Sequence, residues 1–406
     1  MKFTFLTSDA RVAPVMATAI VSAVTLSLSS PTFAQLTPSQ YSATEFTTTV
    51  YGVLDAGVRY SDGLGLTATS SPSANANSNT AAASSVDRSG RFGITGGEDL
   101  QGGYKALFTL EGDLYLTTGS TNPNLGTGKD TSATTTNKLF ERQATVGLAT
   151  PYGNVFLGRQ QSATRDIIDD IDAINGRFTS FNPNLQYTAL NSSSLVSSSS
   201  TYYGTGNPGN DSMMRQDNAV KYIADAGPVT GIVVYSFGGV AGASQSGSSA
   251  EGALSYHEGP LRLSGAYEEL NNINDTLKLT AYTAGGRLTL GDWQVAANYG
   301  SNTADRTTAT QIKTNIASVG TTYAATSAID LTLGYYHVDR SWSADAKPDA
   351  SIKRVIGFAE YKFSAKTLAF LEFDHNNWGG DPTQFQGNAA NKSTTTGFTI
   401  GIDHKI

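Results

Sequence analysis

Cysteine is absent from the 406-residue chain, and charged residues are scarce. Without cysteine the protein has no disulfide framework, no thiolate metal site and no cysteine nucleophile. Charged residues make up 15% of the sequence, against about 25% in an ordinary soluble domain. The formal net charge is −7, and no basic stripe stands out, so nucleic acid is not expected as a partner. These shortages exclude a coiled coil and a highly charged disordered chain.

Motifs for catalysis and cofactor binding are also missing. The sequence has no G-x-S-x-G elbow, no phosphate-binding P-loop and no G-x-G-x-x-G fingerprint after an expected strand. The four histidines lie far apart and form no H-x-x-x-H pair: His257, His337, His375 and His404. We therefore predict no catalytic, cofactor-binding or metal site, and we do not expect an enzyme. A hydrolase triad, which is defined by geometry alone, is left open by the sequence.

Long apolar runs are limited to the N-terminus. Two basic residues precede an apolar stretch at residues 12–28, and small residues at Thr32 and Ala34 fit a signal-peptidase site. The prediction is a signal peptide over residues 1–34 and a single exported domain over residues 35–406. A transmembrane anchor is the alternative, but the stretch is short, contains a proline and ends in a cleavage-like site. No later segment offers about 18 uninterrupted apolar residues, so a membrane-embedded domain would have to be a barrel.

What the sequence does contain is a two-residue alternation of apolar and polar side chains. Residues 104–116, 293–299, 354–363 and 398–406 each place apolar side chains on one face and mostly polar ones on the other. This alternation indicates β-strands that bury one face or turn it toward lipid. Each segment spans about ten residues, the length that a tilted strand needs to cross a bilayer core.

Short turns and longer polar loops alternate between the expected strands. The short turns are expected at residues 97–102, 150–153, 225–228, 258–260, 291–292, 326–328 and 364–366. The loops are expected near residues 61–87, 117–138, 162–214, 240–248, 271–275, 302–309, 341–350 and 377–393. Seven turns and eight loops join sixteen strands, and both ends of the domain then lie on the short-turn side.

This pattern predicts an all-β fold, a 16-stranded antiparallel transmembrane β-barrel with short periplasmic turns and long extracellular loops. The alternative is a soluble all-β protein, such as a propeller or stacked sandwiches, which would also show alternation. The sequence has no blade repeat with a fixed motif, and its charge is scarce, so the barrel is favoured.

The loop at residues 162–214 is by far the longest, and loops of this length are unusual unless they are functional or disordered. In a wide barrel such a loop can fold into the lumen and narrow it. It carries an acidic cluster of Asp166, Asp169, Asp170 and Asp172. The alternatives are a short surface helix with a solvated acidic face, or a calcium loop. The calcium pattern fails because, counted from Asp170, glycine falls at position 7 and not at the position 6 of an EF-hand.

Five segments resemble, in this order, strands of the general Gram-negative porins of the betaproteobacterial type. They are residues 50–58 (VYGVLDAGV), 90–100 (GRFGITGGEDL), 139–148 (LFERQATVGL), 153–160 (GNVFLGRQ) and 215–222 (RQDNAVKY). The resemblance covers nearly all of the chain after residue 34. It implies a 16-stranded barrel, a homotrimer, and passive diffusion of ions and small hydrophilic solutes. It also implies contact with outer-membrane lipid and lipopolysaccharide, and a third loop folded into the lumen as a constriction.

The same resemblance implies which charges line the constriction. In this family an arginine ladder on the barrel wall faces acidic residues of the third loop. The matching wall positions are Arg91, Arg142 and Arg215, and the loop acids would come from the cluster at residues 166–172. No cofactor is implied. The chain departs from the family at its last residue, which is usually phenylalanine and here is Ile406.

The leading functional hypothesis is a general diffusion porin in the outer membrane of a Gram-negative bacterium. A solute-selective channel on the same fold, for sugars or dicarboxylates, is the second hypothesis. The third is an outer-membrane hydrolase or adhesin that uses the barrel as a scaffold. Conductance measured with assorted solutes separates the first two, and a lipid or peptide hydrolysis assay tests the third.

Overall fold

The computed structural model describes residues 46–62, 78–119, 121, 139–178, 181–187, 214–305, 308–343, 349–380 and 392–406. The expected signal peptide at residues 1–34 lies outside this part of the chain. Within the described ranges the chain forms seventeen strand segments and two helices. Neither helix is long and apolar enough to cross a membrane.

In the described ranges, helices interrupt the series of strands at one place. They are β1 (Phe46–Asp62), β2 (Ser78–Ser84), β3 (Arg91–Gln101), β4 (Tyr104–Asp113), β5 (Gln143–Thr150), β6 (Gly153–Gln161), β7 (Arg215–Ala226), β8 (Val229–Ser236), β9 (Ser249–Glu258), β10 (Leu261–Asn271), β11 (Lys278–Leu290), β12 (Trp293–Asp305), β13 (Gln311–Ala324), β14 (Ile329–Trp342), β15 (Ala350–Lys362), β16 (Thr367–Gly380) and β17 (Thr394–Lys405). The helices α2 (Ala163–Ile171) and α3 (Pro183–Tyr187) lie between β6 and β7.

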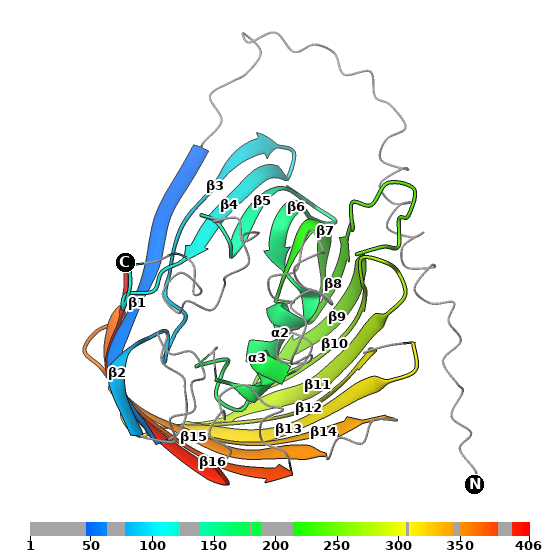
Figure 1. Ribbon diagram of the computed structural model, residues 1–406. Coiled ribbons are helices and arrows are strands. Elements are labelled where there is room, and N and C mark those ends of the chain that lie inside the picture. The colour runs from blue at the N-terminus through cyan, green and yellow to red at the C-terminus, as the bar shows by residue number, and fades with distance from the viewer. Residues whose placement is uncertain are drawn as a thin grey trace, which may run out of the picture. The chain divides into compact units, whose positions relative to one another are not determined.

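The strands form one antiparallel sheet that closes on itself (Figure 1). From β3 to β17 each strand pairs with the next one along the chain. The ring is completed by β1 and β17, whose pairing runs from Val53 with Lys405 to Asp62 with Thr396. Closure joins the first and last strands of the sheet, as a sheet inside a bilayer requires.

One position in the wall is shared by two strand segments. The first half of β1 pairs with β3, and its second half pairs with β2. Residues 85–90 interrupt the wall between them, and the backbone N–H groups of residues 86–88 donate hydrogen bonds to the fully buried carboxylate of Asp55. The seventeen segments therefore occupy sixteen wall positions, and the prediction of a 16-stranded barrel is confirmed.

Tight turns join the strands at one end of the barrel. The turns between β3 and β4, β5 and β6, β7 and β8, β9 and β10, and β11 and β12 each leave two residues outside the strands. At Gly259 and Gly291 the backbone has φ of 55° and 58°, values that a residue without a Cβ adopts at little cost. Both chain ends of the barrel lie at this end, because Phe46 pairs with Glu98 and the backbone N–H of Lys405 donates to Lys366 in the last short turn.

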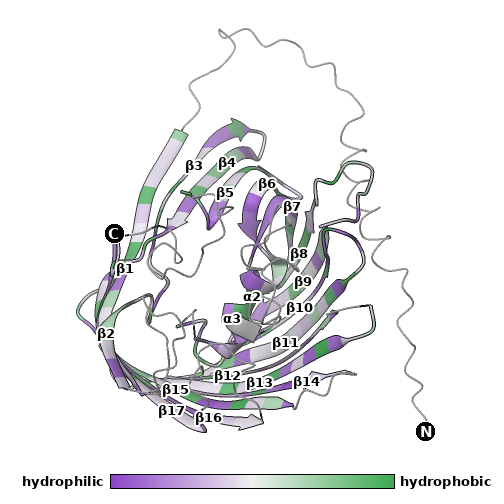
Figure 2. Ribbon diagram, viewed as in Figure 1, coloured by the Kyte–Doolittle hydropathy of each residue, from purple (hydrophilic) through white to green (hydrophobic). Residues whose placement is uncertain are grey.

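Hydrophobic and hydrophilic residues alternate along the strands (Figure 2), and the exposed positions on the outer face are mostly apolar. Along β17, Phe398, Ile400 and Ile402 are 51%, 61% and 50% exposed, whereas Thr399 and Asp403, on the opposite face, are buried. Aromatic pairs lie on the outer face at different heights along the strands. Trp293 stacks on Tyr323 near the short turns, and Phe373 packs on Phe398 farther from them. Such an apolar band flanked by aromatic side chains is typical of barrels that sit in lipid.

Candidate functional site

The third loop lies inside the ring of strands and not above it. Figure 1 shows α2 and α3 within the barrel. Helix α2 packs through Ile167, Ile168 and Ile171 against inward-facing residues of β7 to β10, including Val234, in one buried cluster. Its amphipathic sequence explains this placement, because the opposite face carries the charged residues. The loop therefore covers one part of the inner wall and leaves the wall of β3 to β7 facing it.

The N-terminus of α2 is held by two glutamates of the barrel wall. The backbone N–H of Ala163 donates to Glu251 at 2.6 Å, and the hydroxyl of Thr164 donates to Glu268 at 2.9 Å. Glu251 and Glu268 are directly opposite each other on β9 and β10, and both are buried. Carboxylates are favourable partners for the free N–H groups at a helix start. The loop thus begins at a fixed point on the wall.

Aromatic and arginine side chains hold the other half of the loop. The guanidinium of Arg354 lies 3.5 Å from the ring centroid of Phe181 and donates to the carbonyl of the same residue. Arg59 of β1 lies 5.0 Å from the ring centroid of Phe178 and forms ion pairs with Glu372 and a second acid of β16. These contacts join the loop to β1, β15 and β16, on the other side of the barrel from β9.

The three arginines singled out on the wall lie close together. Arg91 begins β3, Arg215 begins β7, and Arg142 directly precedes β5, so all three are at the same end of alternate strands in one part of the wall. Arg142 donates to Glu111 and Asp113 of β4, each at 2.5 Å. Arg91 lies 3.7 Å from Glu111, and Arg215 interacts electrostatically with both Arg142 and Asp113. The structure therefore brings the three residues into one cluster with two acids between them.

Arg159 belongs to the same cluster, although sequence reasoning did not single it out. It is buried on β6, forms an ion pair with Asp217 at 2.5 Å and donates to the carbonyl of Glu141. A shift in register between Gly158 and Gln160 interrupts the alternation just where this arginine lies. We call the group on β3 to β7 the basic wall: Arg91, Arg142, Arg159 and Arg215.

The four aspartates of the loop have different surroundings. Asp166 accepts a hydrogen bond from Lys221 of β7 at 2.5 Å, and burial raises the pKa of this carboxyl while Lys221 opposes the rise. Asp169 forms a 2.8 Å ion pair with Arg165 within the helix, and its side chain is 46% exposed. Asp170 contacts two groups of the wall, the His257 ring at 2.9 Å and the guanidinium of Arg262 at 2.7 Å.

Asp172 is buried and does not line the lumen. Its carboxylate accepts hydrogen bonds from the Tyr336 hydroxyl at 3.0 Å, from the side-chain amides of Asn182 and Asn184, and from the backbone N–H groups of residues 174 and 176. All of these donors point inward to one carboxylate, so the residue fixes the bend of the loop after α2. Its position differs in this respect from the lumen-facing role expected for the whole acidic cluster.

No group of three or more histidine, aspartate or glutamate side chains is arranged to hold a metal ion within the described ranges. The aspartates that resembled a calcium loop are instead spread over different partners. Asp170 contacts wall residues and Asp172 contacts loop amides and Tyr336.

The closed barrel, its internal loop and its charged inner wall define a class of outer-membrane channel proteins. The chain belongs to the Gram-negative porin family, whose family description matches residues 17–381. The protein is therefore placed in the outer membrane. Its sequence is 28% identical over 152 residues to an outer membrane porin protein of Bordetella pertussis, and that alignment covers 36% of each chain.

Solved structures with the same fold cover most of the chain. The anion-selective porin from Comamonas acidovorans matches with a TM-score of 0.69 and 21% identity, over 89% of this chain and all of that one. The trimer form of OmpT, an outer membrane protein of Vibrio cholerae, matches with a TM-score of 0.61 and 16% identity, over 89% of this chain and 99% of that one. Salmonella typhi OmpF matches with a TM-score of 0.55 and 13% identity, over 88% and 97%.

Proposed function

We propose that the protein is a general diffusion porin, a water-filled channel through which ions and small hydrophilic solutes cross the outer membrane passively. The observation that carries this proposal is the closed barrel with a charged inner wall and a long loop fixed inside it. An apolar outer band keeps such a barrel in lipid, and a polar interior admits water. Neither cofactor nor catalytic residue is needed for this activity, and we propose no enzymatic role.

The narrowest part of the channel lies, on this proposal, between the basic wall and α2. The wall offers its partly exposed arginine, Arg91, with 32% of its side chain accessible, while its acidic neighbour Glu111 is only 10% accessible. The helix offers Asp169, which is 46% accessible, while its partner Arg165 is 14% accessible. The accessible charge is thus positive on the wall and negative on the helix, which supports a transverse field at the constriction. The constriction residues are Arg91, Arg142, Arg215, Asp166, Asp169 and Asp170, with Asp172 fixing the loop.

A channel with a preference among ions is the second candidate. The Comamonas acidovorans protein of the same fold is an anion-selective porin, and the cluster of four arginines on the basic wall favours anions near β3 to β7. The acids of α2 and β4 oppose that preference. We therefore expect a weak selectivity that responds to single charge changes.

A homotrimer in outer-membrane lipid is the proposed assembly. The Vibrio cholerae OmpT structure is described as a trimer form, and many of the described strands of this barrel carry large exposed apolar side chains. No nucleic acid is expected as a partner.

The test is a planar-bilayer recording of the purified full-length protein. We expect stable step-like currents in KCl and permeation of small neutral solutes that falls steeply with solute size. Folded protein that inserts into the bilayer without conducting would contradict the proposal. Hydrolysis of lipid or peptide by the same preparation would favour the scaffolded-enzyme alternative.

A further inference from the structure

Two acidic side chains of the barrel wall meet beneath the N-terminus of α2. Glu251 of β9 and Glu268 of β10 pair directly across the two strands. Side chains in such a position have Cβ atoms about 4.5–5.5 Å apart. Both residues are enclosed, with 1% and 0% of their surface exposed, and they interact electrostatically with each other. We call them the buried acid pair.

Each carboxylate of the pair has one oxygen with a hydrogen-bond donor and one without. The backbone N–H of Ala163 donates to Oε2 of Glu251, and the Thr164 hydroxyl donates to Oε2 of Glu268. The Oε1 atoms of both glutamates are buried and accept no hydrogen bond from the residues that the structure describes. Buried polar atoms nearly always have a partner. Two such oxygens on neighbouring side chains therefore indicate that a donor belongs between them.

The charged groups around the pair do not neutralise it. Lys221 of β7 and Asp166 of α2 act electrostatically on Glu251, but these two residues form an ion pair with each other at 2.5 Å. On the flanking strands the residues opposite the pair are uncharged: Val234 on β8 and Ala281 on β11. With both glutamates ionised, this region would hold three carboxylates and one ammonium group.

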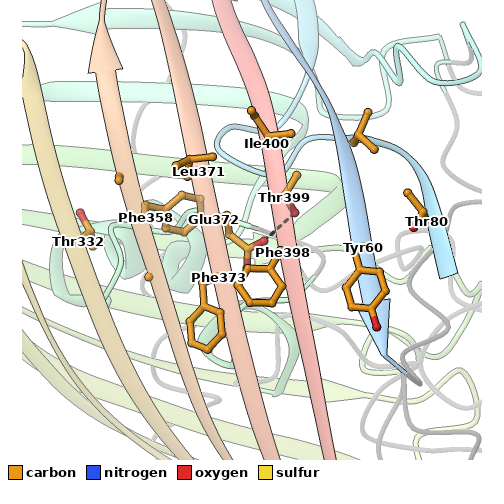
Figure 3. Close-up of a pocket in the computed structure, with 13 residues that line it drawn as sticks. Tyr60, Thr80, Thr332, Phe358, Leu371, Glu372, Phe373, Phe398, Thr399 and Ile400 are labelled. Atoms are coloured by element: carbon orange, nitrogen blue, oxygen red, sulfur yellow. Dashed lines mark hydrogen bonds between the residues drawn. The ribbon is translucent and has the colours of Figure 1, made fainter. Parts of the chain in front are cut away.

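Another pair of acids on the inner wall has an arginine as its partner. Glu372 and Asp374 of β16 both form ion pairs with Arg59. Glu372 also accepts a hydrogen bond from the Thr399 hydroxyl at 2.7 Å (Figure 3). The guanidinium supplies the positive charge that buried carboxylates need. The buried acid pair contacts the start of a helix instead, which is equivalent to about half an elementary charge.

We propose that the buried acid pair shares one proton and that this proton keeps the third loop attached to the barrel wall. Two carboxylates that share a buried site do not both ionise readily, and the pair then retains a proton. The protonated Oε1 of one glutamate donates a hydrogen bond to Oε1 of the other, so both oxygens gain a partner. The single negative charge that remains faces the N-terminus of α2, where it is stabilised.

The shared proton makes the attachment of α2 depend on pH. In the attached state the pair binds one proton. In a detached state both glutamates face water and ionise as ordinary carboxylic acids do, above about pH 5. Raising the pH therefore favours detachment, by up to about tenfold per pH unit for one proton. This regulation rests on the proposed channel function, because α2 borders the narrow part of the lumen.

Bilayer recordings of the full-length protein test the pH dependence. Detachment of α2 should appear as sublevels of the open-channel current, and the time spent in them measures the ratio of detached to attached loop. For wild type we expect this ratio to rise between about pH 6 and about pH 10, by at most about tenfold per unit. Glu268→Gln should abolish the rise, because its amide donates to Glu251 without a titrating proton. The matched control is Glu269→Gln, at the next position of β10 on the outer face, which should keep the wild-type dependence.

Infrared spectroscopy tests the proton without any current. The spectrum of wild type at neutral pH minus that of Glu268→Gln should contain the carbonyl band of a protonated carboxyl group. The same subtraction with Glu269→Gln should not contain it. A protein that shows the band and carries no current would contradict the channel assignment and not the shared proton, so the two failures are distinguishable.

Three results would overturn the proposal. They are a difference spectrum without the band, a wild-type ratio that does not change with pH, and a Glu268→Gln variant with the wild-type pH dependence. Replacing KCl by choline chloride at constant pH supplies a further check. If that exchange raised the time spent in sublevels, a potassium ion and not a proton would lie between the glutamates. If Glu268→Gln does not fold, Glu251→Gln replaces it in both measurements with the same expected results.

Discussion

Each acidic residue of the third loop has its own partner, so the four carboxylates are not equivalent. The carboxylates of Asp166 and Asp170 contact basic groups of the barrel wall, while the carboxylate of Asp169 forms its ion pair with Arg165 of the same helix. Asp172 is enclosed by hydrogen-bond donors. Exposed charges act on permeating ions, whereas the enclosed one acts on the shape of the loop.

The partly exposed Asp169 and Asp170 should influence ion selectivity. An ion about 8 Å from one charge in a water-like dielectric interacts with it by about 0.5 kcal/mol, close to RT. We therefore expect Asp169→Asn combined with Asp170→Asn to shift the permeability ratio toward anions by about 2–3-fold for each charge. Arg91→Gln should shift it toward cations. Reversal potentials in a KCl gradient measure both changes.

Salt provides the control for this prediction. The Debye length falls to about 3 Å at 1 M salt, so both shifts should shrink as KCl is raised. A reversal potential that the double aspartate variant leaves unchanged at low salt would show that α2 does not line the narrow part of the channel.

Asp172→Asn should loosen the loop and have little direct electrostatic effect on ions. The amide that replaces one oxygen is a donor and would face the donors of Tyr336, Asn182 and Asn184. A buried donor left without an acceptor costs about 1–3 kcal/mol. We expect lower thermal stability and noisier open-channel current, measured by heating and by bilayer recording. Asp169→Asn, at an exposed position, is the matched control and should leave stability unchanged.

For single residues, the sequence predicts which charged side chains belong to the site better than it predicts which groups they contact. Arg91, Arg142 and Arg215 could be named through the family resemblance, and the structure places them together. Arg159 could not, because the register shift beside it breaks the alternation. The partners of the aspartates depend on which strands the loop packs against, and no local pattern encodes that.

Strands are the elements that the sequence predicts best. Two-residue alternation marks β4, β12, β15 and β17 directly, and glycine or proline marks the tight turns between strands. The division of one wall position between β2 and β3 was not predictable from the pattern, because the interruption depends on the distant Asp55 carboxylate. The sequence also did not predict that α2 packs on β7 to β10, because an amphipathic helix can pack on any apolar surface.

A substitution on the outer face of β17 can test whether this face lies in the lipid. Ile402 points outward between Ala56 of β1 and Ala369 of β16. Ile402→Arg should destabilise the barrel by about 2–4 kcal/mol, the cost of arginine near the bilayer midplane. Urea unfolding in lipid vesicles measures the change. The control is Thr394→Arg at the long-loop end of the same strand, where the cost should fall to about 0–1 kcal/mol. Equal costs at the two positions would contradict the assigned depth.

For the whole molecule, the even number of expected strands placed both ends of the domain on the short-turn side, and the pairing of β1 with β17 closes the barrel. The resemblance also implied a loop inside the lumen, and the packing of α2 and Phe181 on the inner wall gives that loop two separate points of attachment. The route of the loop across β9 to β16 required the structure, because it depends on inward-facing residues from strands far apart in sequence. The loop is thus fixed to the barrel wall at both ends of its path across the lumen.

Closure gives the sharpest test of the whole fold. Deleting Phe398–Ile406 removes most of β17 and leaves the facing edges of β1 and β16 without partners. Each backbone polar group left unpaired in lipid costs several kcal/mol, so the truncated chain should not assemble. We expect the full-length protein to migrate as a heat-sensitive oligomer on gels and to give a strand-dominated circular dichroism spectrum, and the truncated chain to do neither. Ile406→Phe, which restores the usual last residue of the family and keeps the pairing, is the control and should assemble normally. Recovery of heat-sensitive oligomers from the truncated chain would mean that pairing of β17 with β1 is not needed to close the barrel.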